Sequence, residues 1–175
     1  MRVAGGELRG RRLTGPRGER PTTERVREAV FSILGGVEGA RVLDLFCGSG
    51  ALGIEALSRG AASAVLVDTD PRAARANVEA LDLGERAETV RSDACRYLDR
   101  APEGAFDLVL CDPPYGLEDD TRDRLAPLLS RALAPGGRAV TESSPERPLA
   151  LELPLMRERR YGDTLVRVYA REGKA

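Results

Sequence analysis

The 175-residue chain has no histidine. Histidine is the usual general base of enzymes, a member of Ser-His-Asp triads and the commonest nitrogen ligand of zinc. Its absence excludes those triads and most zinc sites, and no metal is expected. Any chemistry must therefore use carboxylates, hydroxyls, amides, thiols or a bound cofactor.

Cysteines and long apolar runs are also scarce. Cys47, Cys95 and Cys111 form no CxxC pair and no even-numbered disulfide framework, which favours a reduced, cytoplasmic setting. We interpret these thiols as packing residues, since no neighbouring base would activate them. No apolar run is long enough to cross a bilayer, and the first residues lack the apolar core of a secretory signal. We therefore expect neither secretion nor a membrane partner.

Lysine is almost absent, because Lys174 is the single lysine among 27 basic residues. The formal net charge is −1, yet residues 1–27 carry +5 and the remainder −6. A basic segment on an acidic body favours a polyanionic partner, although the solvated surface of an arginine-rich protein would look the same. The predicted phosphate contacts are Arg9, Arg11, Arg12, Arg20 and Arg25.

Length and composition fit a single globular domain. Glycines divide residues 2–20 into short stretches, which predicts a hairpin and a loop. Apolar residues at helical spacing then predict a helix from Pro21 to Leu34. We therefore divide the chain into a basic N-terminal arm over residues 1–20 and a main domain over residues 21–175.

From residue 41 onward, predicted strands and helices alternate, which is typical of a parallel sheet with helices on both faces. A helix is expected after each of the first four strands, and Pro135-Gly136-Gly137 is expected to end the last one. The last two strands are expected to form an antiparallel hairpin, which completes an α/β fold with a mostly parallel, seven-stranded sheet. The predicted strands are Arg41–Leu45, Ala64–Val67, Glu88–Arg91, Phe106–Cys111, Arg138–Glu142, Leu151–Leu155 and Thr164–Ala170. Ligands of such sheets bind at the carboxyl ends of the strands, so the residues there are the candidates for function.

A glycine-rich turn follows the first predicted strand. Gly48, Gly50 and Gly53 have the GxGxxG spacing of dinucleotide-binding loops, which lets the backbone approach a ligand closely. Asp44 precedes the first glycine by four residues, and its carboxylate would repel a pyrophosphate. The same carboxylate would suit the cationic amino acid end of S-adenosylmethionine, directly or through water. A structural aspartate that caps the turn is the alternative.

Acids also follow the second and third predicted strands. Asp68 lies twenty residues after Gly48, where a carboxylate can accept hydrogen bonds from both ribose hydroxyls of an adenosine. NAD and S-adenosylmethionine share that ribose, so Asp68 does not separate them. Asp93, followed by Ala94, could accept from the adenine amino group or cap the next helix. Three acids after three successive strands are a more specific pattern than any one of them.

The fourth strand ends in Asp112-Pro113-Pro114-Tyr115. The two prolines fix the backbone and remove two N–H donors, which leaves carbonyl oxygens aimed outward. The Asp112 carboxylate adds an acceptor, and the Tyr115 ring adds a stacking surface. These groups suit the exocyclic NH₂ of a base, and we predict all four residues to be catalytic. A rigid turn that leaves a buried strand is the structural alternative.

Together these motifs resemble a known family. The segment VLDLFCGSGALGIEAL, followed by Asp68, Asp93 and DPPY, is similar to the class I, Rossmann-like methyltransferases of exocyclic amines. The segments GGELRGRRL, RPTTERVREAVFSIL and RERRYGDTLVRVYAR are similar to the bacterial 16S rRNA guanine-N2 methyltransferases of the RsmD type. The resemblance covers nearly the whole chain, and Arg20–Leu34 is its most specific part. Asp68, where many members have glutamate, and Cys47, where alanine is commoner, depart from the family pattern.

The resemblance implies methyl transfer from S-adenosylmethionine to N2 of one guanine in 16S rRNA, within the small ribosomal subunit or its assembly intermediate. Asp112 through Tyr115 would hold the guanine, with Asp112 and the Pro113 carbonyl accepting its two amino protons. Thr22, Thr23 and Arg25 would lie near the methionine end of the cofactor. By the matching motifs, the cofactor-binding residues would be Asp44, Gly48, Gly50, Asp68, Asp93, Ala94 and Thr23.

Three alternatives stay open. An NAD-dependent oxidoreductase would explain the GxGxxG spacing and Asp68, but it leaves DPPY unexplained and would lack a histidine for hydride chemistry. An amino-methyltransferase with the same core could act on DNA, on adenine N6 of another RNA, or on a protein amine. A non-catalytic RNA-binding module could keep the fold without the cofactor.

Overall fold

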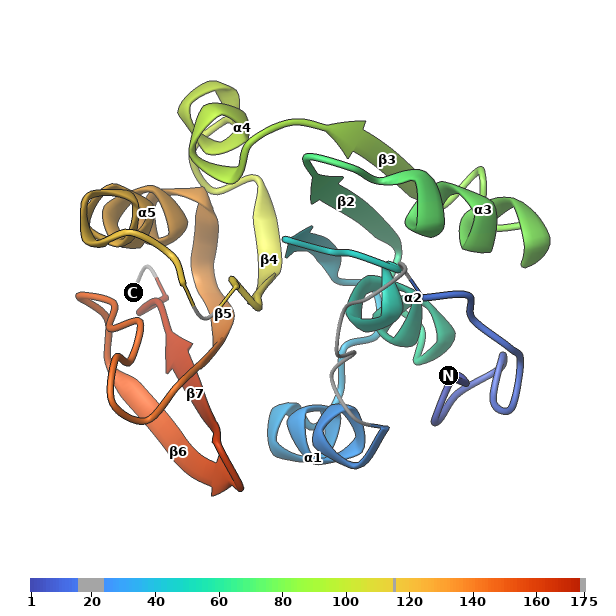
Figure 1. The fold of residues 1–175 in the computed structure, drawn as a ribbon, viewed down its shortest axis with the longest axis horizontal. Coiled ribbons are helices and arrows are strands. Elements are labelled where there is room, and N and C mark those ends of the chain that lie inside the picture. Colours follow the sequence, from blue (N-terminus) through green and yellow to red (C-terminus); the bar gives the residue numbers. More distant parts are fainter. Residues whose placement is uncertain (16–23, 115, 174–175) are drawn as a thin grey trace.

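The computed structural model describes residues 1–15, 24–114 and 116–173. Seven strands form one sheet in the order β3-β2-β1-β4-β5-β7-β6 (Figure 1). The first five strands run parallel, and β7 runs antiparallel to both β5 and β6. The strands are β1 (Arg41–Leu45), β2 (Ser63–Asp68), β3 (Ala87–Arg91), β4 (Phe106–Cys111), β5 (Leu133–Ser143), β6 (Leu155–Tyr161) and β7 (Thr164–Ala170). This topology confirms the predicted α/β fold with an antiparallel C-terminal hairpin.

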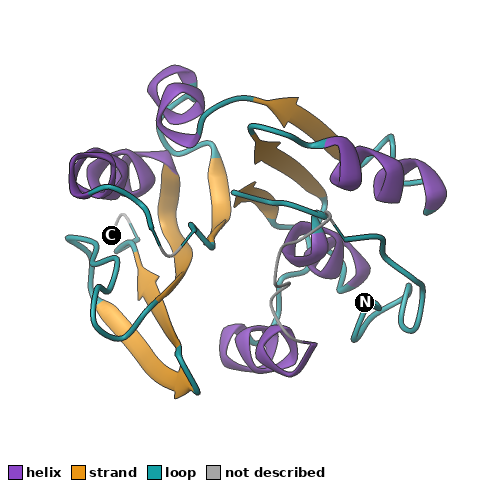
Figure 2. Ribbon diagram, in the orientation of Figure 1, coloured by secondary structure: helices purple, strands orange, loops and turns teal. Residues whose placement is uncertain are grey.

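Helices cover both faces of the sheet (Figure 2). They are α1 (Glu24–Leu34), α2 (Ala51–Ser58), α3 (Arg72–Ala80), α4 (Ala94–Arg100) and α5 (Asp119–Ala132). Alternate residues of each central strand enter two separate cores, since side chains of a strand point to opposite faces. On β4, Leu108 and Leu110 join the core under α1, α2 and α3, whereas Val109 and Cys111 join the core under α4 and α5.

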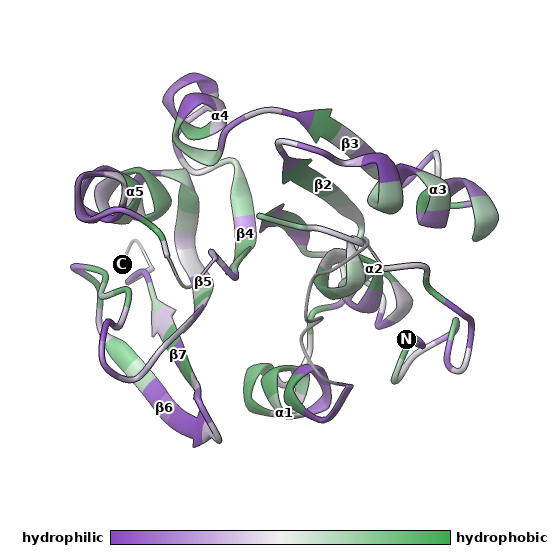
Figure 3. Cartoon of the chain, in the orientation of Figure 1, coloured by the Kyte–Doolittle hydropathy of each residue, from purple (hydrophilic) through white to green (hydrophobic). Residues whose placement is uncertain are grey.

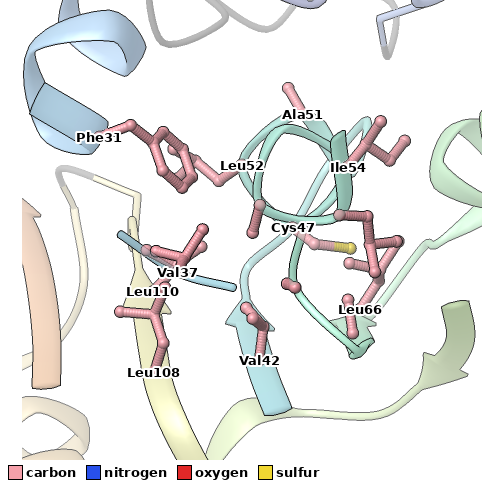
Figure 4. Packing of buried hydrophobic residues seen from close by; sticks show 14 of the residues in the cluster. Phe31, Val37, Val42, Cys47, Ala51, Leu52, Ile54, Leu66, Leu108 and Leu110 are labelled. Carbon is pink, nitrogen blue, oxygen red and sulfur yellow. The ribbon is translucent and has the colours of Figure 1, made fainter. Parts of the chain in front are cut away.

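The core under α1, α2 and α3 joins the sheet to the helices on either side of β1 in the sequence. Helix α1 precedes β1, and α2 follows it. Figure 4 shows Phe31 of α1 pointing toward Leu52 of α2, with Leu108 and Leu110 of β4 on the sheet side. Phe31 and Leu108 are almost completely buried. Burying a side chain of this size contributes about 1.5–3 kcal/mol, so this core holds α1 and α2 firmly over the sheet.

The Pro135-Gly136-Gly137 segment does not end a helix but lies inside β5, so the predicted helix end was wrong. Helix α5 stops at Ala132, and β5 begins at the next residue. Gly136 has a φ of +77°, and the register of β4 against β5 shifts between Phe106 and Leu108. The segment is therefore an irregularity of a long strand, which glycine allows because it tolerates a left-handed backbone.

The predicted strand over Leu151–Leu155 was also wrong. The strand of the hairpin is β6, Leu155–Tyr161, and its side chains are exposed along nearly its whole length. Leu149 and Leu151 are buried from a loop instead, where the Leu149 carbonyl accepts a hydrogen bond from the Thr141 hydroxyl at 3.2 Å. An edge strand that no helix covers shows no alternation of apolar and polar residues. The apolar loop before it therefore matched the pattern of a strand better than β6 itself.

Residues 1–15 fold back on themselves and are fastened to α2. The segment forms one antiparallel bridge, between Arg2 and Arg12, rather than regular strands. The backbone N–H groups of Ala4 and Gly5 each donate to the Glu55 carboxylate at 2.8 Å. This part of the arm therefore packs on the main domain. The predicted domain boundary at residue 20 lies outside the described residues.

Gly53 sets how closely α2 can approach the sheet. A Cβ at Gly53 would lie 2.2 Å from Leu66 Cδ2 and 3.2 Å from Asp44 Oδ2. Gly53→Ala should lower the free energy of unfolding by about 1–3 kcal/mol, because overpacking outweighs the gain in helix propensity. Urea unfolding measures the change. Gly84→Ala is the control, since nothing lies within 4 Å of its Cβ position, and it should stay within about 0.5 kcal/mol. Equal stability of the two variants would contradict the close packing.

Candidate active site

The turn between β1 and α2 is held rigidly on several sides. The Gly48 N–H donates to Asp68 Oδ2 at 2.9 Å, and the Asn77 amide donates to the Ser49 carbonyl at 2.9 Å. Phe46, Gly48 and Gly50 all have positive φ, of 58°, 52° and 75°. A Cβ at Gly50 would lie 3.0 Å from Leu66 Cδ1. The glycines therefore permit a tight turn that lies close against the second strand.

Asp44 is buried directly beneath this turn, with 1% of its surface exposed. Its Oδ2 accepts a hydrogen bond from the Gly53 N–H at 2.9 Å, so it does cap the start of α2. Burial raises the pKa of Asp44 to about 7, helped by the negative charges of Asp112 and Asp68 and opposed by the Gly53 hydrogen bond. A buried carboxyl with this pKa would be charged more readily if a cation lay beside it.

Asp68 joins the ends of β1 and β2. One carboxylate oxygen accepts from Gly48, and the other accepts from the Asp70 N–H at 2.9 Å. Asp68 is only partly buried, so the carboxylate is exposed to a ligand above the turn as well as fixed by the backbone. Its orientation is therefore set before any ligand binds.

Asp93 is the N-cap of α4. Its Oδ1 accepts from the Arg96 N–H at 3.0 Å, and the side chain is otherwise exposed at the end of β3. Ala94 is buried beneath it. The structural role that was the alternative for Asp93 is thus present, and one carboxylate oxygen is committed to it. The parallel order β3-β2-β1-β4 brings Asp93, Asp68, Asp44 and Asp112 to the same edge of the sheet.

Asp112 and Pro113 follow β4 immediately beside this edge. β1 and β4 are paired, with Leu45 opposite Cys111, so Asp112 adjoins the turn that begins at Phe46. Pro113 is buried and Pro114 is exposed. The Pro114 carbonyl accepts the Leu117 N–H at 3.0 Å and closes the turn, which leaves the Pro113 carbonyl as the candidate acceptor for a ligand. Tyr115, Thr22, Thr23 and Arg20 lie outside the described residues.

Glu142 is a further acid at this edge that was not predicted from the sequence. It lies at the carboxyl end of β5, is 4% exposed, and its Oε1 has no hydrogen-bond partner among the described residues. Burial and the charges of Asp112 and Asp44 raise the pKa of Glu142 well above its usual range, and Arg27 opposes them. The rule applied to the first four strands, that acids at strand ends are candidates, would have found it.

Arg27 is a second missed residue, fully buried although it lies on α1. Its guanidinium donates to the Arg2 carbonyl at 2.5 Å and lies 4.0 Å from Glu55. Burial lowers the pKa of Arg27, while the charges of Glu55, Glu24, Glu142 and Glu28 raise it. Arg27 therefore links α1 to the N-terminal segment and to Glu55 of α2.

Four of the five predicted phosphate contacts, Arg9, Arg11, Arg12 and Arg25, lie in the described parts of the chain. Arg9 follows Leu8, whose N–H donates to Ser58 Oγ at the end of α2, and Arg11 lies 3.4 Å from the Ala80 carbonyl at the end of α3. Both helices begin at the carboxyl ends of the strands and run back along the sheet. Arg9 and Arg11 therefore lie toward the amino ends of the parallel strands. Arg12 and Arg25 are exposed. Whether any of them contacts RNA stays a prediction.

The three cysteines are buried and free of disulfides. Burial raises the pKa of Cys47, Cys95 and Cys111, so each thiol is neutral at physiological pH. In the described parts of the chain, no cluster of three or more carboxylates or thiols is arranged to hold a metal ion. No helix of the described residues is long and apolar enough to cross a membrane.

Known proteins resemble this chain in both sequence and fold. The family described as Conserved hypothetical protein 95 matches residues 1–170. Ribosomal RNA small subunit methyltransferase D of Escherichia coli K12 is 39% identical over 186 aligned positions, which cover 99% of this chain and 91% of that protein. The enzyme of the same name from Haemophilus influenzae is 30% identical over 182 positions, covering 97% and 93%.

Solved structures give the same result. The Escherichia coli protein yhhF superposes with a TM-score of 0.84 at 37% identity, covering 99% of both chains. An RNA methyltransferase from Salinibacter ruber, solved with S-adenosyl-L-homocysteine, superposes with a TM-score of 0.68 at 21% identity, covering 89% of this chain and 96% of that one. The latter likeness concerns the fold.

The sheet order and the relatives place this chain among the methyltransferases with a Rossmann-like fold. Within that class, the chain belongs to the Conserved hypothetical protein 95 family, which matches it over nearly its whole length.

The raised pKa of Asp44 should make stability depend on pH. Because folding raises this pKa from 3.8 to about 7, the folded protein holds a proton that the unfolded chain releases, and Asp44 costs increasing stability as the pH rises from about 4 to 7. Asp44→Asn keeps an oxygen for the Gly53 N–H but cannot ionise. Its stability relative to the parent protein should therefore rise through that window and level off above it. Chemical unfolding at several pH values measures this, with Asp120→Asn as the exposed control. A difference that does not change with pH would show that Asp44 ionises normally.

Proposed function

We propose that this chain transfers a methyl group from S-adenosylmethionine to the exocyclic N2 of a guanine in 16S rRNA, within the small ribosomal subunit or its assembly intermediate. The observation that carries the proposal is the pairing of β1 with β4, which sets the Asp112-Pro113 acceptors beside the glycine turn. A base amine and a methyl donor held at these two places would be neighbours. The names of the relatives, which are rRNA methyltransferases, support this substrate class.

The residues at the edge of the sheet fit the donor. The acids are of the right chemistry for its three ends, a cationic amino acid, a ribose and an adenine amine. Asp68 would accept from the ribose hydroxyls, and the exposed oxygen of Asp93 would accept from the adenine amine above Ala94. Asp44 would act on the cationic end through its charge, since it is buried, and Gly48 and Gly50 would let the donor approach the backbone. Thr23 and Arg25 are assigned to the same end by resemblance.

The donor supplies a methyl group on a positively charged sulfur. Asp112 and the Pro113 carbonyl would accept the two protons of the guanine amine as hydrogen bonds. The nitrogen lone pair, which is normally delocalised into the ring, would then face the methyl group. Tyr115 would stack on the base once it has left its helix or loop. Positioning of this kind can supply roughly 7–11 kcal/mol of the barrier, so neither a histidine nor a metal is required.

Asp112→Ala tests the amine acceptor directly. Methyl transfer to rRNA should fall by at least about 100-fold, because the amine loses the group that orients its lone pair. Affinity for S-adenosylmethionine, measured by calorimetry, should be largely unchanged. Asp120→Ala removes an exposed acid from the first turn of α5 and is the control. Full activity of Asp112→Ala would end the proposed role.

The same acceptors would suit the N6 amine of adenine, so the substrate needs its own experiment. A tritiated methyl assay on 16S rRNA, DNA and ribosomal protein, followed by mass spectrometric mapping of the modified base, identifies the acceptor atom. Label on guanine N2 of small-subunit rRNA supports the proposal. Label on adenine, on DNA or on protein would replace the substrate while keeping the fold and the donor.

The basic N-terminal segment is proposed to contact rRNA phosphates through Arg9, Arg11, Arg12, Arg20 and Arg25. Arg11→Ala/Arg12→Ala should weaken RNA binding and flatten its dependence on salt, by about 0.7–0.9 in the logarithmic slope for each phosphate that is no longer neutralised. Filter binding of a 16S rRNA transcript at several salt concentrations gives both quantities. An unchanged slope would count against a role of this pair in RNA binding.

A further inference from the structure

The hairpin of β6 and β7 ends at the same edge of the sheet as the proposed active site. β7 is antiparallel to β5, with Val166 opposite Glu142, and Arg159 of β6 is opposite Val166 in turn. Arg159 is therefore two strands away from the acid that lies beside Asp112. Figure 1 shows this hairpin as the outermost part of the sheet, with its turn on the side of α1.

The exposed side chains of this strand are mostly arginine. Arg157, Arg159 and Arg160 are all exposed, and in the described part of the chain none of them forms an ion pair. Glu158 is the acid among them, and Arg167 of β7 binds it at 2.7 Å. Figure 3 shows the end of β6 as strongly hydrophilic. Apart from Asp163 in the hairpin turn, the strand therefore presents uncompensated positive charge to solvent.

The register divides these arginines between two faces. Residues directly opposite in an antiparallel pair share a face, and Arg157 and Arg159 are opposite Val168 and Val166. Both valines belong to the core under α1. Arg157 and Arg159 therefore lie together on the α1 side of the sheet, and Arg160 lies on the other side.

The opposite flank of the active site has the opposite charge. Four exposed acids follow the DPPY motif at the start of α5: Glu118, Asp119, Asp120 and Asp123. Among them Asp119 is paired, with Arg147. A polyanion would be repelled there and attracted on the β6 side, so the charge at this edge favours one direction of approach.

We propose that Arg157 and Arg159 of β6 form a docking surface for the phosphates of rRNA that flanks the base in the active site. This rests on the proposed function for its substrate. The contacts would position the RNA without reading its sequence, as phosphate contacts do. They would complement the N-terminal arginines. Arg9 and Arg11 lie toward the amino ends of the parallel strands, whereas Arg157 and Arg159 lie on the hairpin whose turn is at the carboxyl ends, beside the proposed active site.

Protection of an edge strand against pairing with another molecule is the competing explanation, since charged residues commonly serve that purpose. β6 is an edge strand, and Leu155 and Met156 on it are 49% and 59% exposed. Edge protection needs charge of either sign, however, whereas phosphate binding needs positive charge. If the arginines protect the edge, removing their charge should cause self-association. If they bind phosphates, removing it should weaken RNA binding.

The test compares Arg157→Ala/Arg159→Ala with two matched variants. Arg157→Lys/Arg159→Lys keeps the charge, and Arg100→Ala/Arg124→Ala removes the same charge from the face of α4 and α5. For each protein, filter binding gives the Kd for a 16S rRNA transcript at several salt concentrations. Methyl transfer gives kcat and the KM for RNA, calorimetry gives the affinity for S-adenosylmethionine, and size-exclusion chromatography gives the oligomeric state. The single variants decide the question if the double alanine variant fails to fold.

The alanine pair should bind RNA about tenfold more weakly and lower the logarithmic salt slope by about 1.4–1.8, which corresponds to two phosphate contacts. The KM for RNA should rise with Kd, whereas kcat at saturating RNA and donor affinity should not change. The lysine pair and the Arg100/Arg124 control should behave like the parent protein. Unchanged RNA affinity and slope, with or without self-association of the alanine pair, would overturn the proposal. If the parent protein binds rRNA but does not methylate it, the proposed function fails, and the binding data still decide the role of β6.

Discussion

The structure is organised around a concentration of negative charge at one edge of its sheet. Asp44, Asp68, Asp112 and Glu142 follow or end neighbouring strands, and Asp44 and Glu142 are almost completely buried. Burial raises the pKa of both buried acids, and the neighbouring negative charges raise it further. A ligand with a positive sulfur and a positive amine would relieve this repulsion. On the proposed function, the edge is prepared for a cationic methyl donor before one binds.

The carboxylates at this edge repel one another, so the backbone must hold them together. Two sets of hydrogen bonds do this. The Gly53 N–H, in the first turn of α2, fixes the Asp44 carboxylate, and the Gly48 N–H, in the turn before α2, fixes the Asp68 carboxylate. The N-terminal segment then fastens α2 through Glu55, which also binds Arg59 at 2.8 Å. Fixed carboxylates need no reorganisation when a ligand arrives, and that is the main requirement for electrostatic catalysis.

The parallel half of the molecule could be predicted from sequence because its signals are local. The strands β1, β2 and β4 are short, mostly apolar runs, and an acid after or near the end of each of the first four strands marks the ligand edge. Glu142 was missed because it ends a strand that was treated as purely structural. β6 was missed because it has no covering layer, and its charged residues give no alternating pattern. The burial of Arg27 depends on α1, α2 and the N-terminal segment meeting in three dimensions, which no local pattern encodes.

The features that fix the chemistry and those proposed to choose the substrate lie in different parts of the sheet. The glycine turn and the Asp112-Pro113 segment, which are proposed to hold the donor and the base amine, are constrained by strands buried on both faces, where a changed residue disturbs packing. Except for Tyr161, which packs against one core, the residues of β6 are exposed, so they can change charge at little cost to the fold. A methyltransferase core of this kind can therefore keep its reaction while its edge strand adapts to a nucleic acid. The proposed role of Arg157 and Arg159 in binding rRNA fits this division, because both side chains are exposed and outside the two cores.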